Sequence, residues 1–410
     1  MPHEPRLRRP LRVALYSGIV VRADAISGSV RTKLQIIRDL AGAGEPVSAT
    51  VFTQACDTAE PEVVQVRSVS DLISDARFRG ADVHVFEFGI HYELFNAVFL
   101  VPPEQAVIAV YHNITPPSLV EEDQRPAIER SLTQKNNLFR ADRIACVSEY
   151  DRDDLVAFGI PPERLTVLHL PPAVIAPARA GGSSDTVEFL CVGRLVPAKG
   201  VLDLARAVVA LRRRGEGGFR VTVAGNQTFS SPACLAEIER LTRDNSLEGY
   251  LRVILSPDDG RLGALYAESD ALVVPSHHEG YCLPVIEALA AGCYVIAYDA
   301  TNLPHITAGL GTLVPPGDVE GLADAMSGFI AESVRARHQG EAPRLPLGAA
   351  ALAGAAWQKA VAEHLRGYSA DAYRRGFVEL LEWAAALPAG AKPAAGVPGG
   401  NGRSLLAARS

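Results

Sequence analysis

Two pairs of charged residues in the second half of the chain have the types and spacing that binding chemistry requires. Arg194 and Lys199 follow one short apolar run, and Glu279 and Glu287 follow another. Where a parallel strand ends in a loop that opens a helix, unpaired backbone N–H groups and the helix dipole attract anions. We call each such strand–loop–helix junction a corner. Cations at one corner and carboxylates at the other suit a ligand that carries both phosphates and hydroxyl groups.

Each corner also has a simpler interpretation when it is taken alone. Glu279 could cap the following helix, and Glu287 could be a first-turn glutamate favoured by the helix dipole. Arg194 and Lys199 could be two solvated surface cations. The first corner is not a phosphate-cradling G-x-x-x-x-G-K-[ST] loop, because Ala198 replaces the glycine before the lysine. The combination of both corners favours a nucleotide diphosphate-sugar.

Short apolar runs alternate with helical periodicity along the chain, and the alternation restarts after a stretch rich in proline and glycine. We expect strands at 12–17, 47–52, 82–88, 106–111, 143–148, 165–170, 187–192, 219–224, 251–255, 271–274, 295–298 and 311–314. We expect helices at 30–40, 71–78, 126–139, 201–213, 234–241, 260–268, 319–330, 349–365 and 370–385, and one that opens near Pro284. Repeated strand–helix units predict an α/β fold of two Rossmann-like, doubly wound parallel-sheet domains.

A length of 410 residues suits two such domains. We expect an amino-terminal domain at 1–176, a linker at 177–186, a carboxy-terminal domain at 187–345, and closing helices at 346–386 that pack back toward the amino-terminal domain. The remaining 387–410 is rich in proline and glycine and has few large apolar side chains, which predicts a disordered tail.

Composition excludes several classes of protein. A net charge of −7 gives no basic excess, which argues against a nucleic-acid partner. Six cysteines without C-x-x-C spacing indicate reduced core residues of a cytoplasmic protein. No apolar run reaches the ~18 residues that span a membrane, and the start at 12–21 is better interpreted as a strand than as a signal peptide. Peripheral contact with the inner face of a membrane and the oligomeric state are left open.

The second half closely resembles the retaining family 4 (group 1) glycosyltransferases of GT-B architecture. The matching segments are G-R-L-x-x-x-K-G at 193–200, P-S-x-x-E-G-[FY]-x-L-P-x-[IL]-E-A at 275–288 and the run at 311–318. In the first half, 111–117 and 147–150 match less specifically. The resemblance implies two Rossmann-like domains with the active site in the cleft between them.

The resemblance also implies roles for individual residues. Arg194 and Lys199 would grip the donor diphosphate, Glu287 the ribose, and Glu279 would lie beside the transferred sugar, while His112 would contact the donor sugar or the acceptor. The implied donor-binding set is Gly193, Arg194, Lys199, Glu279, Gly280, Tyr281, Cys282, Leu283 and Glu287. The implied catalytic set is Glu279, Lys199, Arg194 and His112.

These roles imply transfer of a hexose from a GDP- or UDP-linked donor to a sugar, polysaccharide or lipid-linked acceptor, with retention of anomeric configuration. No cofactor or metal is expected, because cations and a helix N-terminus can stabilise the leaving diphosphate. No close pair of carboxylates suited to double displacement is evident, so attack on the same face of the sugar is favoured. Polysaccharide biosynthesis is the role suggested by analogy.

Two departures, one metal question and two alternatives accompany this interpretation. Cys282 stands where the family usually has glycine, and His305 stands where it often has glutamate. Adjacent His277 and His278 invite a metal site, but neighbouring residues rarely share a face and no third ligand lies nearby, so no metal is expected. The alternatives are another enzyme of the same architecture, such as a sugar phosphorylase or nucleotide-sugar epimerase, and an inactive sugar-nucleotide-binding protein.

Overall fold

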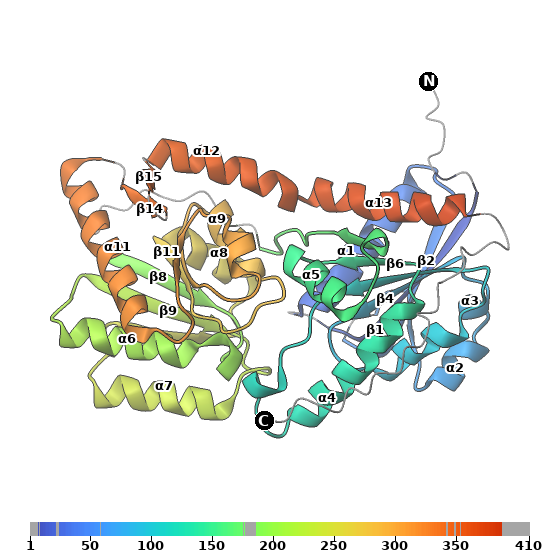
Figure 1. Cartoon of the computed structure of the whole chain (residues 1–410), viewed down its shortest axis with the longest axis horizontal. Coiled ribbons are helices and arrows are strands. Elements are labelled where there is room, and N and C mark those ends of the chain that lie inside the picture. The colour runs from blue at the N-terminus through green and yellow to red at the C-terminus, as the bar shows by residue number, and fades with distance from the viewer. Residues whose placement is uncertain are drawn as a thin grey trace.

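The chain forms two doubly wound α/β domains that lie side by side (Figure 1), which confirms the predicted fold class. The structure is a computed structural model, and it describes residues 7, 9–21, 24–57, 59–174, 176, 186–341, 343–347, 350–352 and 354–387. The expected linker at 177–186, except Thr186, and the expected disordered tail, except Leu387, lie outside the described residues.

The amino-terminal domain is built on a parallel sheet of seven strands in the order β3-β2-β1-β4-β5-β6-β7. The strands are β1 (Leu11–Val20), β2 (Val47–Cys56), β3 (Val63–Gln65), β4 (Val83–Phe88), β5 (Ala106–Tyr111), β6 (Arg143–Cys146) and β7 (Leu165–Val167). The α-helices are α1 (Ala25–Gly42), α2 (Val69–Ser74), α3 (Ala76–Arg79), α4 (Arg125–Gln134) and α5 (Glu149–Phe158). Short 3-10 helices complete the connections at η1 (Glu93–Leu100), η2 (Pro117–Leu119), η3 (Lys135–Arg140) and η4 (Pro162–Arg164).

The carboxy-terminal domain repeats the pattern with six parallel strands in the order β10-β9-β8-β11-β12-β13. The strands are β8 (Val187–Val192), β9 (Phe219–Gly225), β10 (Leu251–Leu255), β11 (Ala271–Val274), β12 (Tyr294–Tyr298) and β13 (Thr312–Val314). The helices are η5 (Pro197–Lys199), α6 (Val201–Arg213), α7 (Pro232–Asp244), α8 (Asp259–Glu268), α9 (Leu283–Ala290), α10 (Leu303–Thr307) and α11 (Val319–Gln339).

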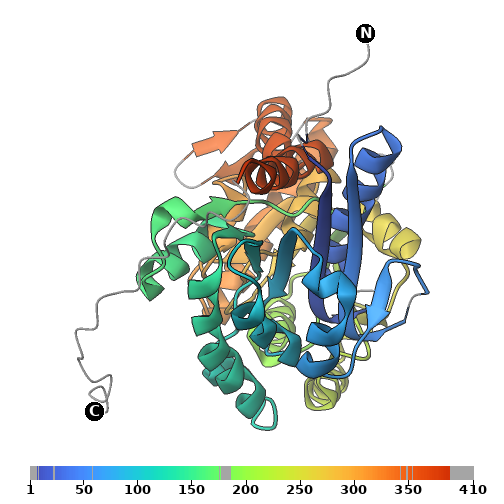
Figure 2. The same cartoon turned by 90° about the vertical axis from the view of Figure 1, so that its right-hand side faces the viewer.

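The end of the chain crosses from one domain to the other. A hairpin of β14 (Leu345–Leu347) and β15 (Ala350–Leu352) leads into α12 (Gly354–His364), a turn η6 (Leu365–Tyr368) and α13 (Ala370–Ala386). Figure 1 shows α12 over the carboxy-terminal domain and α13 over the amino-terminal domain. In the turned view of Figure 2 the red closing helix lies against the blue start of the chain, where Arg374 pairs with Asp39 at 3.0 Å.

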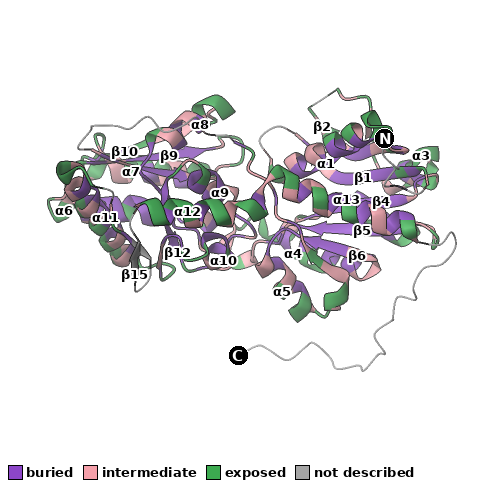
Figure 3. Cartoon of the chain, turned by 90° about the horizontal axis from the view of Figure 1, so that it is seen from above, coloured by how far each residue is buried: buried purple, intermediate pink, exposed green. Residues whose placement is uncertain are grey.

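Burial follows the apolar runs of the sequence. All six residues of β4 and of β5 are buried, and Figure 3 shows the strands of both sheets as buried layers between helices with exposed outer faces. Strands covered on both faces need continuous apolar runs rather than alternation. His84 and Glu87 are the exceptions in β4, and Glu87 is the one that carries a carboxylate inside such a run.

Both sheets have a point at which the strand order reverses, between β1 and β4 and between β8 and β11. In doubly wound sheets, ligands bind outside the carboxyl ends of the strands at such a point. The loops after β8 and β11 carry Arg194, Lys199 and Glu279. The topology therefore gives these residues the position that ligand-binding groups occupy in this class of fold.

Some element boundaries differ from those expected. The helix expected at 349–365 begins only at Gly354, because the preceding segment pairs as the hairpin β14–β15. The helix expected at 71–78 is two helices, and the second is capped by Asp75, whose side chain accepts a hydrogen bond from the Arg77 N–H group. None of the helices that the structure describes is long and apolar enough to cross a membrane.

A close backbone contact fixes the corner after β8 against the end of β11. Gly200 caps α6 with φ of 61°, and a Cβ atom placed on it would lie 1.8 Å from the carbonyl oxygen of Pro275. Next to this contact, the His277 N–H group donates a hydrogen bond to the Ala198 carbonyl oxygen at 2.9 Å. Only glycine allows the two loops to come this close.

We predict that Gly200→Ala lowers the free energy of unfolding by about 3 kcal/mol or more, because it adds a steric clash to an unfavourable φ. Gly215→Ala is the matched control, since Gly215 has φ of 81° but nothing within 4 Å of its Cβ position. The control should lose only about 1 kcal/mol. Urea unfolding of both variants checks this, and equal losses would contradict the role given to the Pro275 contact.

Candidate functional site between the two domains

The structure joins the two charged corners through an ion pair. The Lys199 Nζ atom lies 2.6 Å from Glu279 Oε1, and the Ser276 hydroxyl donates to the same oxygen at 2.8 Å. The backbone of Glu279 exchanges hydrogen bonds with the Thr301 hydroxyl at 2.8 and 2.9 Å. Glu279 does not cap α9, whose N-cap residue is Cys282. The simpler interpretation of Glu279 as a capping residue is therefore wrong.

Next to this ion pair lies a set of unused hydrogen-bond donors. Arg194 is exposed, and its guanidinium makes no ion pair or hydrogen bond with any other residue that the structure describes, so it is not paired with either carboxylate. Within the described residues, the backbone N–H groups of 280–283 also donate no hydrogen bond. A cation and a row of N–H groups at the start of a helix form a surface suited to phosphate.

Cys282 has an unusual backbone conformation for its residue type. It is buried, and its φ of 82° lies in the left-handed region that favours glycine. A side chain in that region costs about 1–2 kcal/mol. The departure from the glycine that the resemblance led us to expect therefore strains the backbone at the N-terminus of α9. Burial also raises the pKa of the Cys282 thiol well above its ordinary value.

Glu287 lies in the second turn of α9 and contacts the chain segment that leaves the amino-terminal domain. Its Oε1 atom accepts hydrogen bonds from the N–H groups of Ala173 and Val174 at 3.1 and 3.0 Å, and its Oε2 atom accepts one from the Tyr266 hydroxyl at 2.8 Å. Burial raises the pKa of this carboxyl. Glu287 is not in the first turn of the helix, so the helix-dipole interpretation does not hold.

His112 reaches the site from the amino-terminal domain, directly after β5. A Cβ atom on Gly280 would lie 2.9 Å from the His112 carbonyl oxygen and 2.5 Å from Asn113 Cβ. His112 is therefore adjacent to the loop that carries Glu279. Its Nε2 atom lies 2.6 Å from Glu87 Oε2, a contact that sequence reasoning did not anticipate.

Further hydrogen bonds hold the two domains together around Gly280. The Ser148 hydroxyl donates to the Gly280 carbonyl oxygen at 2.7 Å, and His278 Nε2 lies 2.8 Å from Asn113 Oδ1. The Tyr281 hydroxyl donates to the carbonyl oxygen of Leu170. Burial lowers the pKa of His278, so its imidazole is favoured in the neutral form at this contact.

The remaining histidines that the sequence singled out lie apart from one another. His277 Nε2 is 3.0 Å from Asp203 Oδ2, on the opposite side of the loop from His278. No group of three His, Cys, Asp or Glu side chains among the described residues could hold a metal ion. His305 is exposed and lies near Glu149, whose pKa of about 2 is lowered mainly by a hydrogen bond from His169.

Two polar residues behind the domain contact were also missed. Asn113 has φ of 67°, and its side-chain amide donates to Asp151 Oδ1 at 2.7 Å. Asp151 is fully buried, and burial raises the pKa of its carboxyl well above the ordinary value. Asp151 lies three residues after Ser148, the N-cap of α5, a position typical of ordinary helix capping, so no pattern in the sequence singled it out.

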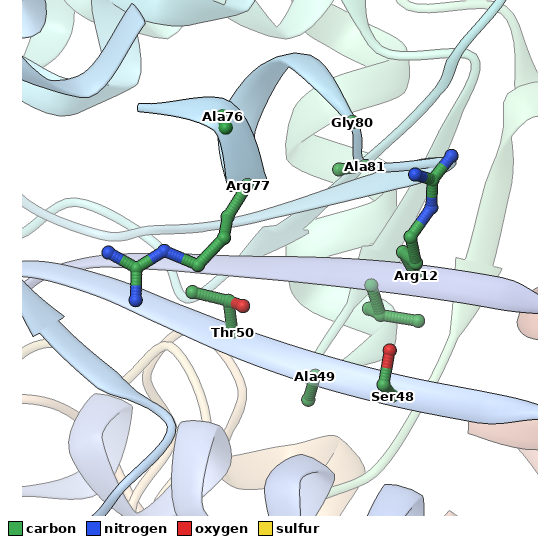
Figure 4. Close-up of a pocket in the computed structure, with 9 residues that line it drawn as sticks. Arg12, Ser48, Ala49, Thr50, Ala76, Arg77, Gly80 and Ala81 are labelled. Carbon is green, nitrogen blue, oxygen red and sulfur yellow. The ribbon is translucent and has the colours of Figure 1, made fainter. Parts of the chain in front are cut away.

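A pocket also lies in the amino-terminal domain, at the end of the strands that is opposite to the site (Figure 4). It is lined by the amino ends of β1 and β2, by α3 and by the loop after α3. Its two arginines point away from each other, and both are already paired, Arg12 with Asp82 at 3.0 Å and Arg77 with Asp75 at 2.7 Å. This pocket is unrelated to the site between the domains.

We predict that Gly280→Ala loosens the domain contact without unfolding either domain, because the new methyl group would overlap Asn113 and the His112 carbonyl oxygen. Hydrogen–deuterium exchange should show faster exchange around 112–114 and 278–283, with β4 and β11 unchanged. Gly249→Ala is the control, since nothing lies within 4 Å of the Gly249 Cβ position. Exchange identical to wild type in the Gly280 variant would contradict the contact.

Comparison with known proteins finds a family match over the carboxy-terminal part of this site. Residues 186–332 match the family model described as glycosyl transferases group 1. O-antigen chain mannosyltransferase B of Escherichia coli is 26% identical over 245 residues, which cover 56% of this chain and 62% of that protein. The chain thus matches less than two thirds of the length of this relative.

Solved structures show the same arrangement of two domains. Sucrose-phosphate synthase of Thermosynechococcus elongatus aligns with a TM-score of 0.70 at 19% identity, covering 91% of this chain and 98% of that one. Anabaena HepE in complex with UDP and glucose aligns with a TM-score of 0.67 at 14% identity, covering 91% and 100%. At these identities the likeness establishes the fold, which is the GT-B architecture.

Proposed function

We propose, from the match of residues 186–332 to the group 1 glycosyl transferases, that the chain transfers a hexose from a nucleotide diphosphate-sugar to a glycan or glycolipid acceptor. The observation that carries the proposal is a set of groups in the carboxy-terminal domain. They converge where the strand order of the second sheet reverses, between β8 and β11. The Lys199–Glu279 ion pair lies there beside an unpaired arginine and a row of free N–H groups among the described residues, with His112 adjacent across the domain contact.

The donor diphosphate would bind at the N-terminus of α9. Arg194 and the N–H groups of 280–283 are donors without partners in the described part of the chain, and phosphate oxygens supply the acceptors that they lack. Lys199 is held beside them by Glu279 and adds a second positive charge. One relative in fold was solved with UDP and glucose, which supports a nucleotide-linked donor for this chain as well.

The proposed reaction follows from where charge develops. Breaking the bond between the sugar and the diphosphate places negative charge on the departing phosphate, and Arg194, Lys199 and the helix N-terminus would stabilise that charge. The acceptor hydroxyl would attack the same face of the sugar and pass its proton to the departing phosphate oxygen, which retains the anomeric configuration.

Glu279 and His112 would orient the transferred sugar from its two sides. The Glu279 carboxylate is fixed by Lys199 and Ser276, so its remaining lone pairs can accept hydrogen bonds from sugar hydroxyls. His112 faces the same loop from the amino-terminal domain. Rigid groups on both sides of a sugar favour one reactive orientation.

Glu287 is proposed to bind the ribose through its one remaining acceptor position. A carboxylate has about four lone-pair sites, and three of them are taken by Ala173, Val174 and Tyr266. Ribose binding at this residue would therefore be coupled to the segment that links the domains. The base and the sugar of the donor and the chemistry of the acceptor depend on residues around this core.

The proposal is tested first by binding and then by turnover. Thermal-shift measurements with UDP, GDP and their sugars should show a raised melting temperature for one nucleotide series, because a ligand that binds only the folded state stabilises it. Transfer assays with the selected donor and a panel of glycan and lipid-linked acceptors then measure kcat/KM.

We predict that Lys199→Ala and Arg194→Ala each lower kcat/KM by about 100-fold, because each removes a charge that stabilises the leaving group. Lys359→Ala, which removes an exposed lysine on α12, is the control and should keep wild-type turnover. Nucleotide binding without transfer or donor hydrolysis would favour an inactive binding protein instead. Turnover close to wild type in both site variants would refute the assignment.

A further inference from the structure

A fully buried ion pair lies behind His112 in the amino-terminal domain. Lys33 of α1 and Glu87 of β4 are both inaccessible to solvent, and Lys33 Nζ lies 2.7 Å from Glu87 Oε1. Lys33 also donates to the Ser29 hydroxyl at 2.5 Å, and that hydroxyl donates to Glu87 Oε2 at 3.2 Å. Buried charges are costly even when paired, so their presence here requires an explanation beyond stability.

The pair is held in its charged form. Burial by itself would raise the pKa of Glu87, but the Lys33 ammonium and His112 outweigh that effect and lower it. Burial likewise opposes the charge of Lys33, yet Glu87 raises the pKa of that amine above its ordinary value. Glu87 is therefore a carboxylate rather than a carboxylic acid, and it can only accept hydrogen bonds.

The two oxygens of Glu87 have different partners. Oε1 accepts from Lys33, while Oε2 lies 2.6 Å from His112 Nε2. Because Oε2 belongs to a carboxylate, the proton of this hydrogen bond is on Nε2 of the imidazole. The other ring nitrogen, Nδ1, has no hydrogen-bond partner among the described residues and keeps its lone pair when the imidazole is neutral.

The closing helix α13 seals the ion pair from solvent. The Tyr373 and Phe377 rings lie over Lys33 Nζ, with centroids 5.5 and 5.9 Å away. The Tyr373 hydroxyl is 3.3 Å from the Ser29 hydroxyl, so it joins the same network. A segment nearly 300 residues from Glu87 in sequence thus completes the surroundings of a residue at the domain contact.

We infer that Glu87 is a positioning residue that fixes His112 as the Nε2–H tautomer, so that His112 presents Nδ1 as a hydrogen-bond acceptor to a substrate hydroxyl. Lys33, under the cover of α13, keeps Glu87 in place and ionised. The inference rests on the proposed function only for the identity of the hydroxyl. The tautomer itself is a property of the protein without substrate.

The replacement Glu87→Gln tests the tautomer because it is nearly isosteric and removes only the charge. Lys33 donates to Oε1 and requires an oxygen there, so the amide nitrogen of the glutamine must take the place of Oε2. That nitrogen donates to His112 Nε2 and moves the imidazole proton to Nδ1. His112 then presents a donor where the wild-type protein presents an acceptor.

The double variant Lys33→Met, Glu87→Gln should reverse this effect. With no ammonium at position 33, the glutamine is free to place its oxygen at the Oε2 position, where it accepts hydrogen bonds from His112 Nε2 and the Ser29 hydroxyl. The Nε2–H tautomer then returns, although the network still lacks both charges. If the ion pair were merely structural, removing its second member would not be expected to restore function.

Nuclear magnetic resonance of the full chain labelled with ¹⁵N-histidine reads the tautomer directly, with His112→Gln to assign the signals. Spectra at about pH 8 favour neutral imidazoles. We expect a proton on His112 Nε2 in the wild type, on Nδ1 in Glu87→Gln, and again on Nε2 in the double variant. A wild-type Nε2 without a proton, or an unchanged tautomer in Glu87→Gln, would overturn the inference.

Activity gives the second readout. In Glu87→Gln, kcat should fall by about 100-fold with a smaller change in donor KM, as when a histidine is held in the wrong tautomer, and the double variant should recover at least about tenfold. Asp82→Asn is the control. Asp82 lies just before β4, at the opposite end of that strand from Glu87, and its carboxylate pairs with Arg12. This replacement should leave kcat unchanged.

The two readouts separate the failure of this inference from that of the proposed function. Absence of transfer by the wild-type protein would reject the proposed activity, while the tautomer spectra would still decide the role of Glu87. If Glu87→Gln does not give a folded protein, the double variant is compared with Lys33→Met alone. The double variant is suited to this because it has no unpaired buried charge. Wild-type kcat in a variant with an inverted tautomer would reject the catalytic consequence.

Discussion

The close approach of Gly280 to the backbone of His112 and Asn113 is the constraint on which the rest of the site depends. No side chain fits between these atoms, so the loop after β11 can rest directly on the end of β5. The contact brings Glu279 and His112, from different domains, to the same place. A second close approach, of Gly200 to Pro275, does the same within the carboxy-terminal domain by holding Lys199 against Glu279. Both contacts depend on the absence of a side chain.

Charge around these contacts is arranged in two layers. Lys199 and Glu279 are paired at the surface of the site, beside an arginine without a partner among the described residues. Lys33 and Glu87 are paired behind it, wholly out of solvent. A buried pair contributes little net stability because desolvation offsets the attraction. It does hold its members, and the imidazole bound to them, in one orientation, which is what a group that contacts a substrate requires.

Strain and domain coupling accompany this arrangement. Cys282 and Asn113 both adopt positive φ on either side of the domain contact, where glycine would be relaxed. Glu287 joins α9 to the segment that leaves the amino-terminal domain through two backbone hydrogen bonds. The closing helix α13 returns to the first domain and covers Lys33. Each connection makes the geometry of the site depend on how the two domains are packed.

The repeated strand–helix order, and with it the two parallel sheets and the loops that carry Arg194, Lys199 and Glu279, could be predicted from the amino-acid sequence alone, because apolar runs and helix starts are local patterns. The sequence could not reveal that Lys33 contacts Glu87 and that Glu87 contacts His112, since these residues come from separate elements that meet only in the packed domain. Nor could it reveal the contacts of Glu287, which are made with backbone N–H groups that have no sequence signature. Tertiary packing decided these contacts because desolvation and close approach depend on neighbours that are distant along the chain.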